Sequence, residues 1–226
     1  MSLQRGIDGR PAHEIPDAEE ESYTDLLRIV FSEKRKAAKG PAIFIDRDGV
    51  INCRRPDDYV LNWSQFIFIP GIREALKQIA SLGLPMIVIS NQAAVGKGLL
   101  DPAGLREITA QMHRALAADG TFLTAAYYCT HRIEEDCVCR KPKPALLHNA
   151  AGDFNIDLSR SIFIGDSETD VQAAHAASCK PILFSAGSEA CHDSRRSVGY
   201  LPTARDANEL FGVAAKCLQD QTLTRP

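Results

Sequence analysis

Five short apolar runs, each about as long as a buried strand, most constrain what this chain can fold into. They occupy residues 42–45, 86–89, 125–128, 161–164 and 181–184. None shows the polar alternation of a half-exposed strand, so we expect strands that are covered on both faces. Strands of this kind separated by helices predict an α/β fold, a Rossmann-like three-layer sandwich with a central parallel sheet.

Helix signals lie between the runs. Residues 72–80 carry apolar side chains at helical spacing, and Gly83 follows as a stop signal. Asp101 and Pro102 are residue types that favour the N-cap and the first position of a helix. Residues 210–218 repeat the helical periodicity near the C-terminus. Ligands of such folds bind beyond the carboxyl ends of the parallel strands, so we expect the functional residues there.

The chain organisation predicts one folded domain. Its 226 residues suffice for one substantial core. Residues 1–40 carry charges, a Glu-rich run and one weakly amphipathic stretch, so we expect an N-terminal extension, followed by the domain over residues 41–220. The segment between Asn52 and Ser90 is too short for a large cap domain. An open site for small substrates is therefore expected.

Charge and hydropathy exclude several kinds of partner. The chain has 26 basic and 29 acidic residues, a formal net charge of -3, which gives no electrostatic reason to expect nucleic acid. No apolar run approaches the ~20 residues that span a bilayer, and the first residues lack the apolar core of a signal peptide. We expect a cytosolic protein, without a membrane partner, that binds a small molecule.

Acidic side chains follow the first and fourth runs. Asp46 and Asp48 lie in IDRDGVIN, and Asp166 and Asp170 lie in IGDSETD. Carboxylates at neighbouring strand ends supply the oxygen ligands that a hard divalent cation requires. Two simpler readings stay open: the Asp-Gly pair forms a turn after a strand, or the later pair caps the helix that follows.

Polar and basic residues follow the second and third runs. Ser90 and Asn91 can donate hydrogen bonds to phosphoryl oxygens, although Ser-Asn also commonly begins a loop. Lys141, in RKPKP, would bring a positive charge to the acidic residues, although a solvated surface lysine is the usual alternative. These residues could bind phosphate, and the two simpler readings stay open.

A second group of residues has the spacing of a metal site. Cys129, His131, Cys137 and Cys139 supply three thiolates and one imidazole, enough for a closed tetrahedral zinc site. Four protein ligands leave no open position, so we expect a structural zinc that clamps residues 129–139, hereafter the zinc loop. The seven cysteines form no obvious disulfide framework. Free cysteines with a surface histidine are the alternative.

Four motifs, DRDGV, SN, RKPKP and GDSETD, occur in the order and strand context of the haloacid dehalogenase superfamily, which the chain resembles over residues 41–187. The resemblance implies that Asp46 is a nucleophile that forms an aspartyl-phosphate. It implies that Asp48 protonates the leaving oxygen and then activates water. It further implies that Ser90 holds the transferring phosphoryl group and that Lys141 screens its charge.

The same resemblance implies a magnesium site. Its ligands would be the Asp46 carboxylate, the Asp48 backbone carbonyl and Asp166, with Asp170 in support. Phosphoryl transfer is catalysed mainly by positioning and by electrostatic stabilisation, which a divalent cation and a lysine provide. A cluster of acidic residues with no cation would be costly because the charges repel one another.

The zinc loop, running into CRKPKP, is similar to the phosphatases of D-glycero-D-manno-heptose bisphosphate and of histidinol phosphate. SNQAAVGKG resembles the heptose group more closely. We therefore expect magnesium-dependent hydrolysis of a small sugar phosphate, D-glycero-D-manno-heptose 1,7-bisphosphate first among them. Asn91 and Arg140 are the expected substrate contacts, with Arg140 aimed at the non-reacting phosphate or the sugar hydroxyls. Arg140 could instead be a solvated loop residue.

Two other functions remain open at this stage. A histidinol-phosphate phosphatase would use acidic neighbours such as Asp57 and Asp58 for its cationic substrate. A non-catalytic, zinc-stabilised interaction module is a different class of protein. That class predicts the loss of at least one catalytic side chain, whereas every residue expected to act on phosphate is present.

Overall fold

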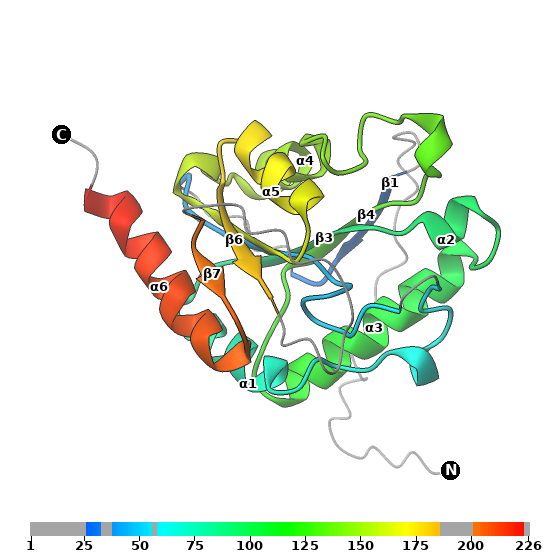
Figure 1. Cartoon of the computed structure of the whole chain (residues 1–226), viewed down its shortest axis with the longest axis horizontal. Coiled ribbons are helices and arrows are strands. Elements are labelled where there is room, and N and C mark those ends of the chain that lie inside the picture. The colour runs from blue at the N-terminus through cyan, green and yellow to red at the C-terminus, as the bar shows by residue number, and fades with distance from the viewer. Residues whose placement is uncertain (1–25, 33–37, 56–57, 186–200, 224–226) are drawn as a thin grey trace, which may run out of the picture.

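The computed structural model describes residues 26–32, 38–55, 58–185 and 201–223, and centres on a seven-stranded sheet (Figure 1). The strand order is β1-β4-β3-β2-β5-β6-β7, and β1 is antiparallel to β4 while the other neighbours are parallel. The strands are β1 (Leu26–Val30), β2 (Ile43–Ile45), β3 (Met86–Asn91), β4 (Ala125–Cys129), β5 (Ile162–Gly165), β6 (Lys180–Phe184) and β7 (Thr203–Ala204).

Helices cover both faces of the sheet, as Figure 1 shows. On one face lie α1, α3 and α6, and on the other lie α4 and α5. The helices are α1 (Ile72–Ala80), α2 (Ala93–Gly96), α3 (Pro102–Ala118), α4 (Ala145–Phe154), α5 (Glu168–Ala176) and α6 (Ala207–Leu223), with short 3-10 turns η1 (Trp63–Gln65), η2 (Ile133–Glu135) and η3 (Leu158–Arg160). This confirms the predicted three-layer α/β sandwich.

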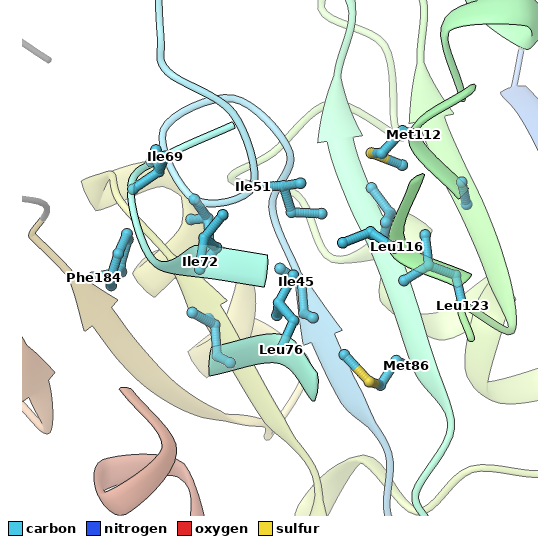
Figure 2. Close-up of a cluster of buried hydrophobic side chains, with 14 of the residues drawn as sticks. Ile45, Ile51, Ile69, Ile72, Leu76, Met86, Met112, Leu116, Leu123 and Phe184 are labelled. Atoms are coloured by element: carbon cyan, nitrogen blue, oxygen red, sulfur yellow. The ribbon is translucent and has the colours of Figure 1, made fainter. Parts of the chain in front are cut away.

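Two buried clusters form the core, one on each side of the sheet. Successive residues of a strand point to opposite faces, so Ile45 packs with the helices of one layer and Phe44 with those of the other. Figure 2 shows Ile45 of β2, Leu76 of α1 and Leu116 of α3 pointing into the first cluster. All three side chains are fully buried. Truncating any of them to alanine should cost about 2–5 kcal/mol of folding free energy.

The structure corrects the expected start of the domain. Residues 26–30 form β1, which pairs with β4, so the folded domain includes residues before Pro41. This edge strand has one buried side chain, Leu27, and a half-exposed Arg28 that pairs with Asp153 at 3.2 Å. A strand with so few buried residues gives only a weak apolar signal. The rest of the expected extension, residues 1–25, lies outside the described residues.

The connection between β2 and β3 carries only η1 and α1, so within the described residues no large cap domain interrupts it, as predicted. Among the residues that the structure describes, the carboxyl ends of β2 and β3 are therefore not covered by a cap domain inserted between these strands. Among the described helices, none combines the length and the apolar character needed to cross a membrane.

Candidate active site

The sheet brings the predicted motifs to one edge. β3, β2 and β5 are neighbours, and Asp46 and Asp166 directly follow β2 and β5, while Ser90 lies near the end of β3. The backbone N–H of Asp46 donates to the carbonyl of Ile164 at 2.9 Å, which fixes the first motif beside β5. Asp46, Asp48, Asp166 and Asp170, hereafter the acidic cluster, meet at this edge.

Lys141 reaches the acidic cluster from the segment after β4. Its Nζ lies 3.0 Å from Oδ1 of Asp46 and 2.6 Å from Oδ1 of Asp170, and it donates to the carbonyl of Ile89 at 3.0 Å. Burial lowers the pKa of Lys141, but the charges on Asp170 and Asp46 outweigh burial and hold that pKa above its usual range. Lys141 is therefore a buried ammonium ion.

Asp46 has the environment of a reactive carboxylate. Burial raises the pKa of its carboxyl group above the usual range, against the opposing charge of Lys141. Oδ1 also accepts a hydrogen bond from the backbone N–H of Arg47 at 2.7 Å. Ser90, which is also buried, hydrogen-bonds Asp46 and lowers its pKa. Any additional cation at this site would favour the ionised form.

Asp48 is held by three side chains. Arg47 Nη2 donates to both carboxylate oxygens, at 3.0 and 2.9 Å, Asn52 donates to Oδ1 at 2.9 Å and Gln92 donates to Oδ2 at 2.7 Å. Although burial raises the pKa of Asp48, these charged and neutral donors outweigh it and hold the pKa below its usual range. Arg47, Asn52 and Gln92 were missed by the sequence analysis, and no spacing pattern singles them out.

Asp166 approaches the first motif through a glycine. Gly49 has a φ of 97°, and a Cβ there would collide with the Asp166 carboxylate, so only glycine permits this approach. Burial raises the pKa of Asp166 to about 7, against the charge of Arg54, whose Nη2 lies 2.7 Å from Oδ1. Burial and the neighbouring carboxylates of Asp46 and Asp170 therefore favour the protonated form of Asp166, whereas Arg54 favours the ionised form.

Asp170 combines a capping role with its place in the acidic cluster. Ser167 is the N-cap of α5, and its backbone N–H and hydroxyl donate to Oδ2 of Asp170 at 3.1 and 2.6 Å. The helix-capping reading and the cluster reading are therefore compatible. A Cβ at Gly165 would collide with Asp170, so this glycine allows the close packing.

The acidic cluster fits a hard divalent cation. One carboxylate oxygen from each of Asp46, Asp166 and Asp170 lies within 4.8 Å of the other two. Oxygen ligands at such spacing suit a cation such as Mg²⁺, and its charge would offset the burial and the carboxylate repulsion that raise the pKa values of Asp46 and Asp166. Both oxygens of Asp170 have protein partners, which suits the expected supporting role.

The four predicted zinc ligands lie together. Sγ of Cys129 lies 3.5 Å from Sγ of Cys137, which lies 3.6 Å from Sγ of Cys139, while Nδ1 of His131 lies 3.3 Å from Cys139 and 3.7 Å from Cys129. A tetrahedral site with Zn–S bonds near 2.3 Å would separate its sulfur atoms by about 3.8 Å. The spacing and donor types therefore fit zinc.

The pKa values of the clustered cysteines are also consistent with a bound zinc ion. Hydrogen bonding from Cys139 lowers the pKa of Cys129 to about 5, whereas the hydrogen bond with Cys129 and burial raise the pKa of Cys139. The three adjacent sulfur atoms cannot all ionise without a cation between them. No disulfide joins any of the six described cysteines, so none competes for these ligands in the described part of the chain.

The two residues expected to contact substrate, Asn91 and Arg140, both have protein partners in the structure. Asn91 Nδ2 donates to the carbonyl of Lys141 at 3.2 Å, and the backbone N–H of Lys141 donates to Oδ1 of Asn91 at 3.1 Å. Asn91 therefore anchors the Lys141 backbone. Arg140 Nη1 donates to the carbonyl of His131 at 3.4 Å, so its guanidinium lies against the zinc loop.

Comparison with known families agrees with the geometry. The family description "haloacid dehalogenase-like hydrolase" matches residues 5–178. The chain belongs to the haloacid dehalogenase-like hydrolase family, and the predicted superfamily and enzyme class are confirmed.

Its relatives include heptose bisphosphate phosphatases. The D-glycero-beta-D-manno-heptose-1,7-bisphosphate 7-phosphatase of Bordetella bronchiseptica is 34% identical over 181 residues, 79% of this chain and 98% of that protein. The D-glycero-alpha-D-manno-heptose-1,7-bisphosphate 7-phosphatase of Mycobacterium tuberculosis is 37% identical over 134 residues, 59% of this chain and 70% of that protein.

Solved structures with a similar fold lead to the same family. The D,D-heptose 1.7-bisphosphate phosphatase of B. bronchiseptica, complexed with magnesium and phosphate, has a TM-score of 0.66 and 30% identity, covering 80% of this chain and 99% of that chain. A protein of Mesorhizobium loti described as HAD-like has a TM-score of 0.74 at 23% identity, covering 88% of this chain and 95% of that chain, and supports the fold alone.

Proposed function

We propose that this chain is a magnesium-dependent phosphatase that hydrolyses a small sugar phosphate through an aspartyl-phosphate on Asp46. The observation that carries the proposal is the convergence of buried Asp46 and Lys141 with Asp48 and Asp166 at one sheet edge. The Asp46 and Asp166 carboxylates and the Asp48 carbonyl would hold the cation, which when bound supplies positive charge to the phosphoryl oxygens.

The proposed reaction has two steps. An ionised oxygen of Asp46 attacks phosphorus, the bond to the leaving oxygen breaks, and that oxygen takes a proton from Asp48. Asp48 must therefore be protonated when substrate is bound, which requires the negative charge of the phosphate ester to raise a pKa that its donors hold low without substrate. Water then attacks the phosphorus of the aspartyl-phosphate, Asp48 takes its proton, and phosphate leaves with Asp46 restored. Arg47 and Gln92 orient the Asp48 carboxylate for both proton transfers.

Two further side chains stabilise the phosphoryl group in this scheme. Ser90 lies beside Asp46 and would donate its hydroxyl hydrogen to a phosphoryl oxygen. Lys141 lies 3.0 Å from Asp46 and would offset the charge that develops on the transferring group. Because Asn91 bonds the Lys141 backbone twice, we assign it to positioning Lys141.

The proposed substrate is D-glycero-D-manno-heptose 1,7-bisphosphate. The named relatives support it, with the beta anomer in one name and the alpha anomer in another. Arg140 follows the last zinc ligand, and rotation of its guanidinium away from His131 would offer it to the non-reacting phosphate. Structural zinc would hold the loop from which Arg140 extends. We also propose that the protein is cytosolic.

Histidinol phosphate is less favoured as a substrate. Of the two acidic residues expected to bind its ammonium group, Asp58 is paired with Arg55 at 2.6 Å and Asp57 lies outside the described residues. A non-catalytic interaction module is less favoured still, because Asp46, Ser90 and Lys141 are all present and both Ser90 and Lys141 contact Asp46.

A substrate panel tests the proposal. Both anomers of the heptose bisphosphate, a heptose monophosphate, histidinol phosphate and p-nitrophenyl phosphate would be compared for phosphate release with Mg²⁺ and with EDTA. We expect one phosphate to leave the bisphosphate with the highest kcat/KM, and EDTA to abolish release. A preference for histidinol phosphate would move the protein to the alternative substrate, and absence of release from every ester would overturn the phosphatase proposal.

A further inference from the structure

Two basic side chains of the active site, Arg47 and Lys141, are buried and held in place by ion pairs. Arg47 pairs with Asp48, and Lys141 pairs with Asp46 and Asp170. The exposed fractions of the two basic side chains are 1% and 3%. Neither can move into solvent without unpacking the core around it, and each would leave a carboxylate of the acidic cluster without its charged partner.

Arg54 is a third cation of a different kind. Its Nη2 lies 2.7 Å from Oδ1 of Asp166 and donates a long hydrogen bond, 3.4 Å, to the backbone carbonyl of Asp48. Its side chain is 47% exposed, so it can turn into solvent. The other oxygen of Asp166, Oδ2, packs against Gly49.

The position of Arg54 matters because both of its acceptors, the Asp166 carboxylate and the Asp48 carbonyl, are groups that the proposed function assigns to magnesium. A guanidinium and a divalent cation on the same carboxylate oxygen would repel each other at short range. We propose that Arg54 is an exchangeable counter-cation: it neutralises the metal-binding oxygens in the metal-free protein, and a divalent cation must displace it to bind.

This exchange has consequences for both partners. The apparent affinity of the oxygens for the metal is the intrinsic affinity multiplied by the fraction of protein in which Arg54 does not hold them. Displacement also frees a half-exposed guanidinium that interacts electrostatically with Asp46, the proposed nucleophile. The inference rests on the proposed magnesium site, but it does not depend on which phosphate ester is hydrolysed.

Direct metal titration tests the inference without substrate. Full-length protein, stripped of exchangeable divalent cations, would be titrated with Mn²⁺ at low ionic strength while free Mn²⁺ is followed by electron paramagnetic resonance. We expect Arg54→Gln to bind Mn²⁺ about threefold or more tightly than the wild type, since a partly exposed ion pair no longer competes. Added salt should narrow the difference because it screens that pair.

Arg55→Gln is the matched control, because Arg55 is the adjacent arginine and pairs with Asp58 rather than with a metal-binding oxygen. We expect its Mn²⁺ affinity to stay near that of the wild type. An equal gain in both variants would mean that net charge alone is responsible, and unchanged or weaker binding by Arg54→Gln would overturn the exchange. If neither variant nor wild type binds Mn²⁺ at this site, the proposed metal site itself fails.

A structure with bound metal gives a second readout. We expect the Arg54 guanidinium to lie beyond hydrogen-bond distance of Oδ1 of Asp166 when Mg²⁺ is present. A metal-bound structure in which the 2.7 Å contact persists would also overturn the inference.

Discussion

Nζ of Lys141 lies 3.0 Å from Oδ1 of Asp46, and both side chains are almost fully buried, with exposed fractions of 3% and 6%. Lys141→Met would leave Asp46 buried beside Asp170 with no ammonium group between them. Removing one partner of a buried pair costs about 3–5 kcal/mol of folding free energy. We expect urea unfolding in EDTA to report a loss of this order, and turnover to fall by about a hundredfold or more.

Lys143→Met is the control for that experiment, because Lys143 pairs with Asp136 on the surface. An exposed pair contributes little to folding stability, so this variant should keep its stability and its turnover. Wild-type stability in Lys141→Met would contradict the view that this lysine neutralises buried carboxylates.

Asp46→Asn should lower turnover by several orders of magnitude while the fold persists, because a neutral amide cannot attack phosphorus. Beryllium fluoride with Mg²⁺ should bind the wild type as an acyl-phosphate mimic and should not bind this variant, as ¹⁹F NMR would record. Asp58→Asn, at an exposed residue, should behave as the wild type. An active Asp46→Asn enzyme would exclude Asp46 as the nucleophile.

Protein purified without chelator should hold about one zinc per chain by elemental analysis. Cys139→Ser should lose the metal and lower the thermal midpoint, because the zinc loop would then lack its clamp. Cys53→Ser, outside the site, should retain the zinc. Purified wild type free of zinc would overturn this assignment.

Arg140→Ala should reduce kcat/KM for the heptose bisphosphate much more than for p-nitrophenyl phosphate, because only the bisphosphate offers a second phosphate to the guanidinium. Arg132→Ala is the control, since Arg132 lies in the same loop and pairs with Glu135 at 3.6 Å. Equal losses of Arg140→Ala on the two substrates would remove its specificity role.

His113 predicts a pH dependence of stability. Its ring stacks on Phe31 at 4.0 Å, and burial lowers its pKa below the ordinary value of 6.5. The unfolded chain then binds the proton more readily than the folded one, so this contribution to stability is present above pH 6.5 and is lost as pH falls through the folded pKa. His113→Phe should flatten that part of the stability profile in denaturant titrations from pH 5 to 8. If His113→Phe and the wild type show the same pH dependence of stability, the proposed contribution of His113 is wrong.

Much of the fold and the outline of the site could be predicted from sequence because their signals are local. The parallel strands are buried on both faces, so each is a continuous apolar run that needs no knowledge of its neighbours. The residues expected to react follow those runs directly, and parallel strands deliver their carboxyl ends to one edge. Cys129 and Cys139 lie close enough in sequence for their spacing to indicate a metal site.

Tertiary structure alone decided how the site is held and neutralised. Arg54 and Asp166 are 112 residues apart, and Gln92 and Asp48 are 44 residues apart, yet both pairs are in hydrogen-bond contact. Such pairs depend on strand order and on the direction of each side chain, which no local pattern encodes. The edge strand β1 was missed for the same reason: its place comes from pairing with β4, and it has little apolar burial of its own.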